Sequence, residues 1–182
     1  MKISLRRLQK KDLSLVMKWR QSAEVTKYMY TDPVLTMDTQ IQWFDALDKK
    51  KTEKYWVIYV EDKSIGVFSL QNIDYKNGKC EAGHYIGELT YRGKGISFIV
   101  ERNIYDYVFE KLNLNKLCWD VLSFNEAAIH LHEKCGAKIE GVRKQHIRKN
   151  NQYYDVIEMA MLRDDWDEVR KLTSYPVIEI SD

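Results

Sequence analysis

The chain has 182 residues, with 29 Lys or Arg against 27 Asp or Glu, so its formal net charge is only +2. Apolar residues make up 45% and charged residues 31%, which is ordinary for a globular protein. The length predicts one domain over residues 1–182, and the balanced charge excludes a general attraction to nucleic acid or to anionic membranes. Any anion-binding site must therefore be local.

Three cysteines, Cys80, Cys118 and Cys135, are odd in number and widely spaced. This pattern indicates reduced thiols in a cytoplasmic protein rather than a disulfide framework. The Cys and His spacings fit no zinc-binding pattern, so we expect no metal. Met1–Arg7 lacks the apolar core of a signal peptide, and the sequence contains no run of about 18 apolar residues that would span a membrane.

The first part of the chain is typical of one strand followed by two helices. Alternating apolar residues predict a strand over Ile3–Leu8. Asp12 is a suitable N-cap for a helix over residues 13–20. An irregular segment follows, and Thr36 or Asp38 then starts a second helix whose apolar residues fall on one face.

Three strands are predicted next. Tyr55–Val60 and Ile65–Leu70 are rich in β-branched and aromatic residues, and a short polar turn separates them. Asn77 and Gly78 form the strongest hairpin signal in the sequence, and they lead into a strand over Lys79–Ile86. We therefore expect three antiparallel strands in the middle of the chain.

A glycine-rich loop, Tyr91–Ser97, follows the third of these strands and opens an amphipathic helix over residues 96–112. The first N–H groups of a helix have no intrahelical partner, and the helix dipole adds positive charge, so this junction favours a phosphate. Gly93 and Gly95 allow positive φ and close approach of a ligand, and Arg92 and Lys94 add full charges. The spacing fits neither a Walker A loop nor a dinucleotide fingerprint.

The rest of the chain predicts a strand over Leu117–Leu122 and a helix that begins at Asn125. A hairpin of two strands, Ile139–Ile147 and Tyr153–Leu162, should follow, with a short helix around Asp165–Leu172. The alternating basic residues of the hairpin, 143–149, are a solvated face rather than a nucleic-acid site.

Two of these stretches resemble motifs of the GNAT superfamily of N-acetyltransferases. Arg92, Gly95 and Ser97 follow the spacing Gln/Arg-x-x-Gly-x-Gly/Ala of its acetyl-CoA pyrophosphate loop, with Ser97 departing at the last position. The resemblance covers roughly residues 3–162 and includes the order of strands and helices. It implies an α/β (α+β) fold with a mixed, mostly antiparallel central sheet and helices on both faces.

The second motif is Asn125–Ala137, which resembles the GNAT segment with Asn, Ala-Ile, an aromatic residue and Glu-Lys-x-Gly. His132 stands where the family carries Tyr, and Ala137 stands where it carries Phe. The resemblance also implies that the strand before the glycine loop and the strand Leu117–Leu122 lie parallel and splay apart, so that the pantetheine arm of acetyl-CoA enters between them. The implied cofactor-binding residues are Tyr85, Ile86, Arg92, Gly93, Lys94, Gly95, Ile96, Ser97, Asn125 and Ala128.

Acetyl transfer to an amine requires a base, an oxyanion donor and a proton donor for the thiolate. The resemblance gives the proton donor to His132 and the oxyanion donor to a main-chain N–H near Tyr85 or Ile86. For the base we favour Glu81, acting through a water, with His84 as runner-up. Side chains three apart on a strand point to opposite faces, so at most one of the two faces the acceptor.

The acceptor is the least determined part of the site. Arg20, Met29, Tyr30 and Trp43 are candidate acceptor-binding residues, because aromatic rings can stack on a base or sugar and Arg can bind a diphosphate. This set resembles the amino-sugar N-acetyltransferases of pseudaminic acid synthesis, so we expect a UDP-linked 4-amino-dideoxy sugar, bound by a monomer or homodimer.

Three alternatives remain open. The first acceptor alternative is the N-terminus of a ribosomal or other protein, since that GNAT branch shares the layout. The second is a polyamine, which is less expected because acidic and basic residues nearly balance over 20–50. A remote alternative is a non-catalytic CoA-binding protein, which the missing family Tyr motivates.

Overall fold

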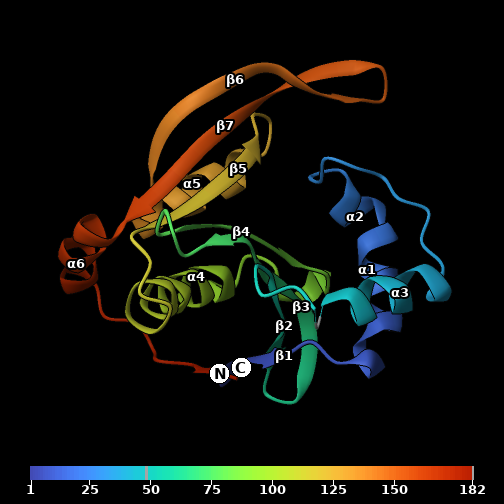
Figure 1. Cartoon of the computed structure of the whole chain (residues 1–182), viewed down its shortest axis with the longest axis horizontal. Coiled ribbons are helices and arrows are strands. Elements are labelled where there is room, and N and C mark those ends of the chain that lie inside the picture. The colour runs from blue at the N-terminus through green and yellow to red at the C-terminus, as the bar shows by residue number, and fades with distance from the viewer. Residues whose placement is uncertain (48, 182) are drawn as a thin grey trace.

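The computed structural model describes residues 1–47 and 49–181. One mixed sheet runs through the molecule in the order β6-β7-β5-β4-β3-β2-β1-β8 (Figure 1). Its strands are β1 Ile3–Arg7, β2 Lys54–Val60, β3 Lys63–Asp74, β4 Lys79–Ile86, β5 Lys116–Leu122, β6 Lys138–Lys149, β7 Gln152–Leu162 and β8 Glu179–Ile180. All the strands expected from the sequence are present, and β8 is an additional one. The predicted fold class is therefore confirmed.

Three helices, α1 Leu13–Gln21, α2 Ala23–Thr26 and α3 Met37–Leu47, separate β1 from β2. Thr36 starts α3 as expected, because its main-chain oxygen accepts the N–H of Gln40 at 3.0 Å. The expectation for Asp12 was wrong in detail. It precedes α1, but its carboxylate accepts the N–H of Gln9 at 2.9 Å and so closes a 3₁₀ turn.

The hairpin of β3 and β4 contains an irregularity that the sequence did not predict. The register passes from Gln71 opposite Glu81 to Asp74 opposite Lys79, so β3 has one more residue than β4 in this stretch. Asn72 lies in this bulge with φ at 49°, in the left-handed region that Asn tolerates better than most residues. The bulge turns the Asn72 side chain toward Glu81.

The strands β4 and β5 are parallel, and α4 Ile96–Asp106 connects them, as expected. Only residues 79–81 of β4 pair with residues 116–118 of β5. Beyond this point the strands diverge, with β4 continuing along β3 and β5 along β7. We call residues 82–86 of β4 and 119–122 of β5 the β4–β5 divergence. After α4 the chain makes a π-helical turn, Tyr107–Lys111, before it enters β5.

The C-terminal part contains α5 Glu126–Cys135, the β6–β7 hairpin and α6 Arg163–Leu172. Asn150 and Asn151 turn the hairpin with φ at 50° and 60°. Figure 1 shows the hairpin extending past the sheet toward α2, and the two chain ends lying side by side. The ends meet because β8 pairs in parallel with β1. None of the described helices is long and apolar enough to cross a membrane.

Each face of the sheet carries its own core. The α4–α5 face buries a large cluster that includes Trp56, Phe68, Val100 and Trp119. The α1–α3 face buries a smaller cluster, which includes Leu13, Trp19, Val57 and Val67. Side chains alternate along β4, so Cys80 and Ile86 pack into the first cluster and Tyr85 packs against the second. This alternation determines on which face of the sheet each candidate side chain of β4 lies.

Candidate active site

The backbone of β4 offers hydrogen-bonding groups toward the β4–β5 divergence. The carbonyl of Gly78 accepts the N–H of Lys116 on the β5 side, whereas the N–H of Gly87 donates to Ile65 on the β3 side. Because the direction alternates along a strand, His84 and Ile86 direct their main-chain groups toward the divergence. Tyr85 directs its own toward β3. Of the two residues expected to supply an oxyanion donor, only Ile86 therefore has a suitably directed N–H.

The glycine loop has the backbone shape expected of an anion-binding loop. Gly93 and Gly95 have φ of 72° and 75° and are exposed. A Cβ built on either glycine would meet no atom within 4 Å, so the surface above the loop is open. The helix α4 starts directly afterwards at Ile96, whose side chain is buried, while Ser97 is half-buried. The main-chain N–H groups at this helix start are the available donors.

The two cationic side chains of the loop, Arg92 and Lys94, differ in their contacts. The Arg92 guanidinium donates to the carbonyl of Ile86 from Nε at 3.0 Å and from Nη2 at 2.9 Å, and it lies 3.8 Å from Glu24. The Arg92 side chain therefore fastens the loop to the end of β4, and its contribution to the phosphate site stays a prediction. Lys94 is exposed, with Nζ 5.1 Å from the Tyr91 ring centroid.

Asn125 is the residue that precedes α5, and Ala128 lies in the first turn of this helix, which begins beyond the end of β5. The Asn125 main-chain oxygen accepts the N–H groups of Ala128 at 3.0 Å and Ile129 at 3.2 Å. Its side chain makes no capping bond to the helix, so the amide stays available for a ligand. Ala128 is half-buried against the larger core cluster.

His132 is buried between α5 and the sheet, with 3% of its surface exposed. Its ring stacks on Trp119 with centroids 4.1 Å apart, and its Nδ1 lies 2.9 Å from Oε2 of Glu101. Glu101, from α4, is fully buried and also accepts the hydroxyl of Tyr105 at 2.6 Å. This pair could not be predicted from the sequence, because the pattern around Glu101 is that of an ordinary amphipathic helix.

Glu81 and His84 point to opposite faces of β4, as the alternation predicted. His84 lies on the α4–α5 face, beside Phe68, Trp119 and His132. Burial lowers the pKa of His84 to about 4, so the imidazole is neutral near neutral pH and is a weak base. Glu81 is exposed on the opposite face, where Oε2 accepts the amide of Asn72 at 2.9 Å.

The expected acceptor-binding residues do not form one group. Trp43 is half-buried and packs edge-on against Tyr55, at the margin of the smaller core cluster. Nη2 of Arg20 donates to the main-chain and side-chain oxygens of Thr31 at 3.0 and 2.9 Å and so fastens this segment, whereas the buried Nη1 has no hydrogen-bond partner among the described residues. Tyr30 is half-buried, and its pKa is raised by burial and by the nearby Asp120.

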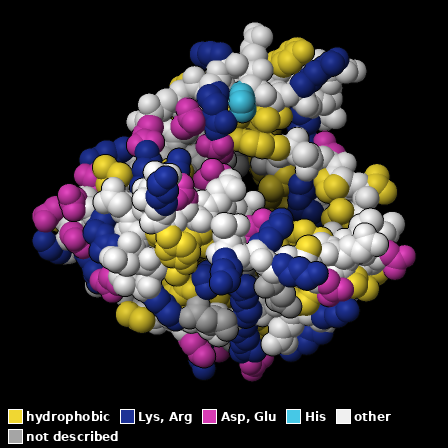
Figure 2. Space-filling view, in the orientation of Figure 1, with side chains coloured by type: hydrophobic (Ala, Val, Ile, Leu, Met, Phe, Trp, Pro, Cys, Tyr) yellow, Lys and Arg dark blue, Asp and Glu magenta, His cyan; other side chains and the backbone are white. Residues whose placement is uncertain are grey.

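A buried lysine joins the acceptor-side segment to the β6–β7 hairpin. Lys149, at the end of β6, donates to the carbonyls of Thr26 and Met29 and pairs with Asp32. Only 7% of its side chain is exposed. Met29 thus contributes through its main chain to a contact that fixes residues 26–32 against the hairpin. Figure 2 shows this side of the molecule hollowed between the hairpin and the helices α1–α3.

Carboxylates from adjacent strands also meet on the Glu81 face of the sheet. Glu81 stands opposite Cys118 in the β4–β5 register, and Asp120 stands opposite Glu158 in the β5–β7 register. Because Cys118 and Asp120 are two apart on β5, all of these side chains share one face. Arg143 of β6 pairs with Asp120, and its Nε lies 3.3 Å from Glu158. Sequence reasoning missed this cluster, since its members are far apart along the chain.

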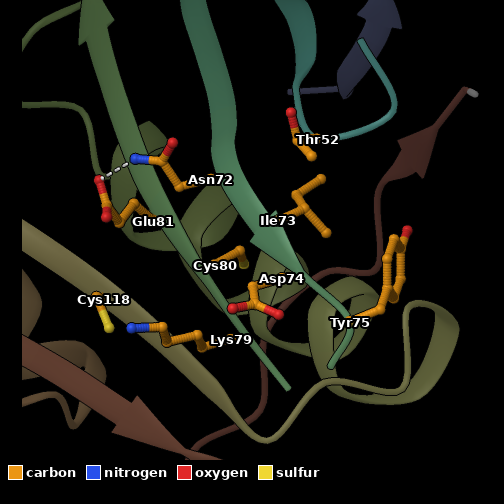
Figure 3. A pocket seen from close by; sticks show the side chains of 9 residues that line it. All are labelled: Thr52, Asn72, Ile73, Asp74, Tyr75, Lys79, Cys80, Glu81 and Cys118. Atoms are coloured by element: carbon orange, nitrogen blue, oxygen red, sulfur yellow. Dashed lines mark hydrogen bonds between the residues drawn. The ribbon is translucent and has the colours of Figure 1, made fainter. Parts of the chain in front are cut away.

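A pocket of about 500 Å³ opens beside Glu81 (Figure 3). Its lining includes two carboxylates, Asp74 and Glu81, against one ammonium, Lys79. Tyr75 and Ile73 provide apolar surface, and Asn72 reaches Glu81 across the bulge of β3. The pocket can therefore hold an elongated, cationic molecule with apolar segments.

The comparisons with known proteins agree with this geometry. Residues 2–138 match the family described as "Acetyltransferase (GNAT) domain". The chain is 27% identical to the spermidine N(1)-acetyltransferase of Escherichia coli strain K12, over 90% of this chain and 88% of that protein. The acetyltransferase PseH of Campylobacter jejuni is 27% identical over 70% of this chain and 77% of its own length.

Among solved structures, the spermidine N-acetyltransferase of Vibrio cholerae, in complex with CoA and spermine, superposes with a TM-score of 0.86. Its identity to this chain is 26%, over 91% of this chain and 98% of that one. The chain belongs to the GNAT acetyltransferase family. It is an N-acetyltransferase that uses acetyl-CoA as cosubstrate and an amine as acceptor, which confirms the family, enzyme class and cofactor expected from the two motifs.

Proposed function

We propose that the acceptor is a polyamine of the spermidine type, rather than the nucleotide-linked amino sugar that the sequence favoured. The observation that carries this proposal is the exposed Glu81 carboxylate at the edge of the β4–β5 divergence, with a pocket beside it. The bond from Asn72 comes from a neutral amide and does not cancel the charge of Glu81. A cationic amine is the natural partner of such a carboxylate.

The surroundings of Glu81 favour a cation with more than one charge. Asp120 and Glu158 share its face of the sheet, and Asp74 lines the pocket. Arg143 lies between Asp120 and Glu158 and offsets part of their charge, so Glu81 and Asp74 are the carboxylates that remain for a ligand. A polyamine could place one nitrogen near Glu81 and lay its methylene chain along Ile73 and Tyr75.

The spacing along β4 favours one position for the reacting centre. Glu81 and Ile86 are five residues apart, which is about 16 Å along a strand, too far for the base and the oxyanion donor to serve one carbonyl. His84 directs its main chain to the divergence as Ile86 does, and it lies nearer to Glu81. We therefore assign the thioester to the N–H of His84, and the pantetheine amide to Ile86.

The remaining roles follow from this placement. Gly93–Ser97 holds the pyrophosphate through its N–H groups, and Asn125 reaches the pantetheine arm. Glu81 removes the proton of the amine through a water. The attack forms a tetrahedral oxyanion at the His84 N–H, and the C–S bond then breaks. His132, beside His84 in the core, gives a proton to the departing thiolate.

The relatives support the same acceptor. The spermidine acetyltransferases of two bacteria match 90% or more of this chain, whereas PseH matches 70%. Two contacts weigh against a nucleotide sugar, because Trp43 is half-buried against the smaller core cluster and Nη2 of Arg20 already donates to Thr31.

An acceptor panel tests the proposal. Spermidine, spermine, a UDP-4-amino sugar and N-terminal peptides would each be supplied with acetyl-CoA, and the release of CoA thiol measured. We expect turnover of the polyamines with a kcat/KM at least ~10-fold above that of any other acceptor, and a marked loss of polyamine turnover in Glu81→Gln. Preference for the amino sugar or a peptide would overturn the acceptor assignment and leave the acetyltransferase activity intact.

A further inference from the structure

The most unusual feature of the interior is the carboxylate of Glu101. It is 0% exposed, although a buried charge is costly unless it is paired and hydrogen-bonded. Both of its oxygens have a partner. Oε1 accepts the Tyr105 hydroxyl at 2.6 Å, and Oε2 lies 2.9 Å from Nδ1 of His132. Burial of such a group costs stability, and its contact with His132 suggests a functional role.

The pair lies next to the β4–β5 divergence. Trp119, on which His132 stacks, is the first residue of β5 beyond the last pair with β4. The ring of His84, whose main chain faces the divergence, is 6.3 Å from that of His132. The His132 imidazole, which α5 carries, is thus surrounded by residues of α4, β4 and β5 at the point where the two strands separate.

We propose that Glu101 is a positioning residue that holds His132 as an imidazolium, with Nδ1–H bound to the carboxylate and Nε2–H directed to the thioester sulfur. When the C–S bond breaks, its electron pair stays on sulfur and the Nε2 proton moves to it. CoA–SH and a neutral His132 result, and solvent restores the proton after CoA leaves. This role rests on the proposed placement of the thioester at His84, but not on the identity of the acceptor.

The other groups around His132 are consistent with this role. Tyr105 of α4 donates to Glu101 and leaves its charge in place. His84 of β4 has a pKa lowered to about 4 by burial, so it is neutral near pH 7. Cys135, on the same helix as His132, has its pKa raised by burial, so it remains a thiol. Glu101 is therefore the charged neighbour that stabilises a protonated His132.

The alternative is a purely structural bond, in which Glu101 is protonated and donates to a neutral His132. Nitrogen-15 NMR of the wild-type protein distinguishes the two without any substitution. The chain has four histidines, and the signals of His132 are those lost in His132→Phe. We expect both ring nitrogens of His132 to carry hydrogen at pH 7. An unprotonated Nδ1 at that pH would overturn the proposal.

Variants extend the test to catalysis. In Glu101→Gln we expect only one of the two ring nitrogens of His132 to carry hydrogen at pH 7, and kcat to fall by at least ~10-fold. The KM for acetyl-CoA should stay within about twofold. In Tyr105→Phe both ring nitrogens should keep their hydrogens and kcat should stay within about threefold of the wild-type value. In His132→Phe kcat should fall at least as far as in Glu101→Gln, and adding Glu101→Gln should lower it no further. A further fall of tenfold in the double variant would show that Glu101 acts independently of His132 and would contradict the proposal.

Discussion

The ring of His84 stacks on that of Phe68, with centroids 5.6 Å apart and planes only 11° apart. The stack lies on the α4–α5 face of β4, opposite the face that carries Glu81. His84 is therefore a packed sheet residue whose main chain, rather than its imidazole, faces the β4–β5 divergence. Its burial has a consequence for the pH dependence of stability.

We expect His84→Phe to reduce the loss of stability in acid. Burial lowers the pKa of His84 from 6.5 to about 4. The unfolded chain binds a proton at His84 below pH 6.5, but the native protein does so only near pH 4. The stabilising contribution is thus complete above pH 6.5 and is lost as the pH falls toward 4, by up to roughly 3 kcal/mol.

Urea unfolding at pH 7 and pH 4.5 would measure this difference. Phe keeps the stack on Phe68, so the variant should fold. His130→Phe, at an exposed position of α5, is the matched control and should follow the wild type. Equal acid sensitivity of His84→Phe and wild type would argue against a buried neutral imidazole.

Gly95→Val should weaken acetyl-CoA binding by at least ~10-fold. The new side chain would occupy the open surface above the loop, and the φ of 75° would also be unfavourable by about 1–2 kcal/mol. Gly78→Val is the control, because Gly78 has a similar φ of 65° in the β3–β4 turn. Calorimetric titration with acetyl-CoA, beside a thermal melt, separates the effects. Wild-type affinity in a folded Gly95→Val would remove the loop from the cofactor site.

Lys149→Met should raise the KM for the acceptor several-fold and leave the affinity for acetyl-CoA unchanged. The substitution removes the lysine donor from the carbonyls of Thr26 and Met29, and among the described residues Thr26 keeps only the N–H of Met29 as a donor, so the cost is about 1–3 kcal/mol. Residues 26–32 would then lose their contact with the hairpin. Lys144→Met, which breaks an exposed pair with Asp155, should cost less than about 1 kcal/mol. Steady-state kinetics and denaturant unfolding would show whether the two lysines differ in this way.

Asn72→Gly should lower kcat by about threefold to tenfold while the protein remains as stable as the wild type. Gly accepts the φ of 49° without strain, so the change removes mainly the amide that orients Glu81. Asn150→Gly, at a φ of 50° in the β6–β7 turn, makes the same exchange far from Glu81 and should not alter kcat. If both glycine variants kept full activity, Asn72 would have no part in positioning the base.

The order of the main elements was predictable from the sequence because each depends on local signals. Gly93 and Gly95 marked the loop, Asn77 and Gly78 marked the hairpin, and apolar periodicity marked α4. The two-residue strand β8 was missed because so short a segment has no periodicity, and its pairing with β1 joins positions more than 170 residues apart.

Much of the site was not predictable, because its contacts depend on packing and register. The Glu101–His132 pair requires α4 and α5 to pack against each other, and the Asp120–Glu158 pair requires the β5–β7 register. Trp43 was assigned to the acceptor because it is aromatic and lies near the expected acceptor segment, and the sequence could not show that α3 packs it, half-buried, against Tyr55.

The most direct test of the central claim is the affinity of a bisubstrate analogue, in which spermidine is joined through an acetyl linker to the sulfur of CoA. If a polyamine and acetyl-CoA meet at the β4–β5 divergence, the analogue should bind at least ~100-fold more tightly than CoA, because it unites both sets of contacts. Glu81→Gln should reduce this advantage without changing the affinity for CoA. An analogue that binds no more tightly than CoA, while the corresponding CoA–amino-sugar conjugate does, would contradict the account.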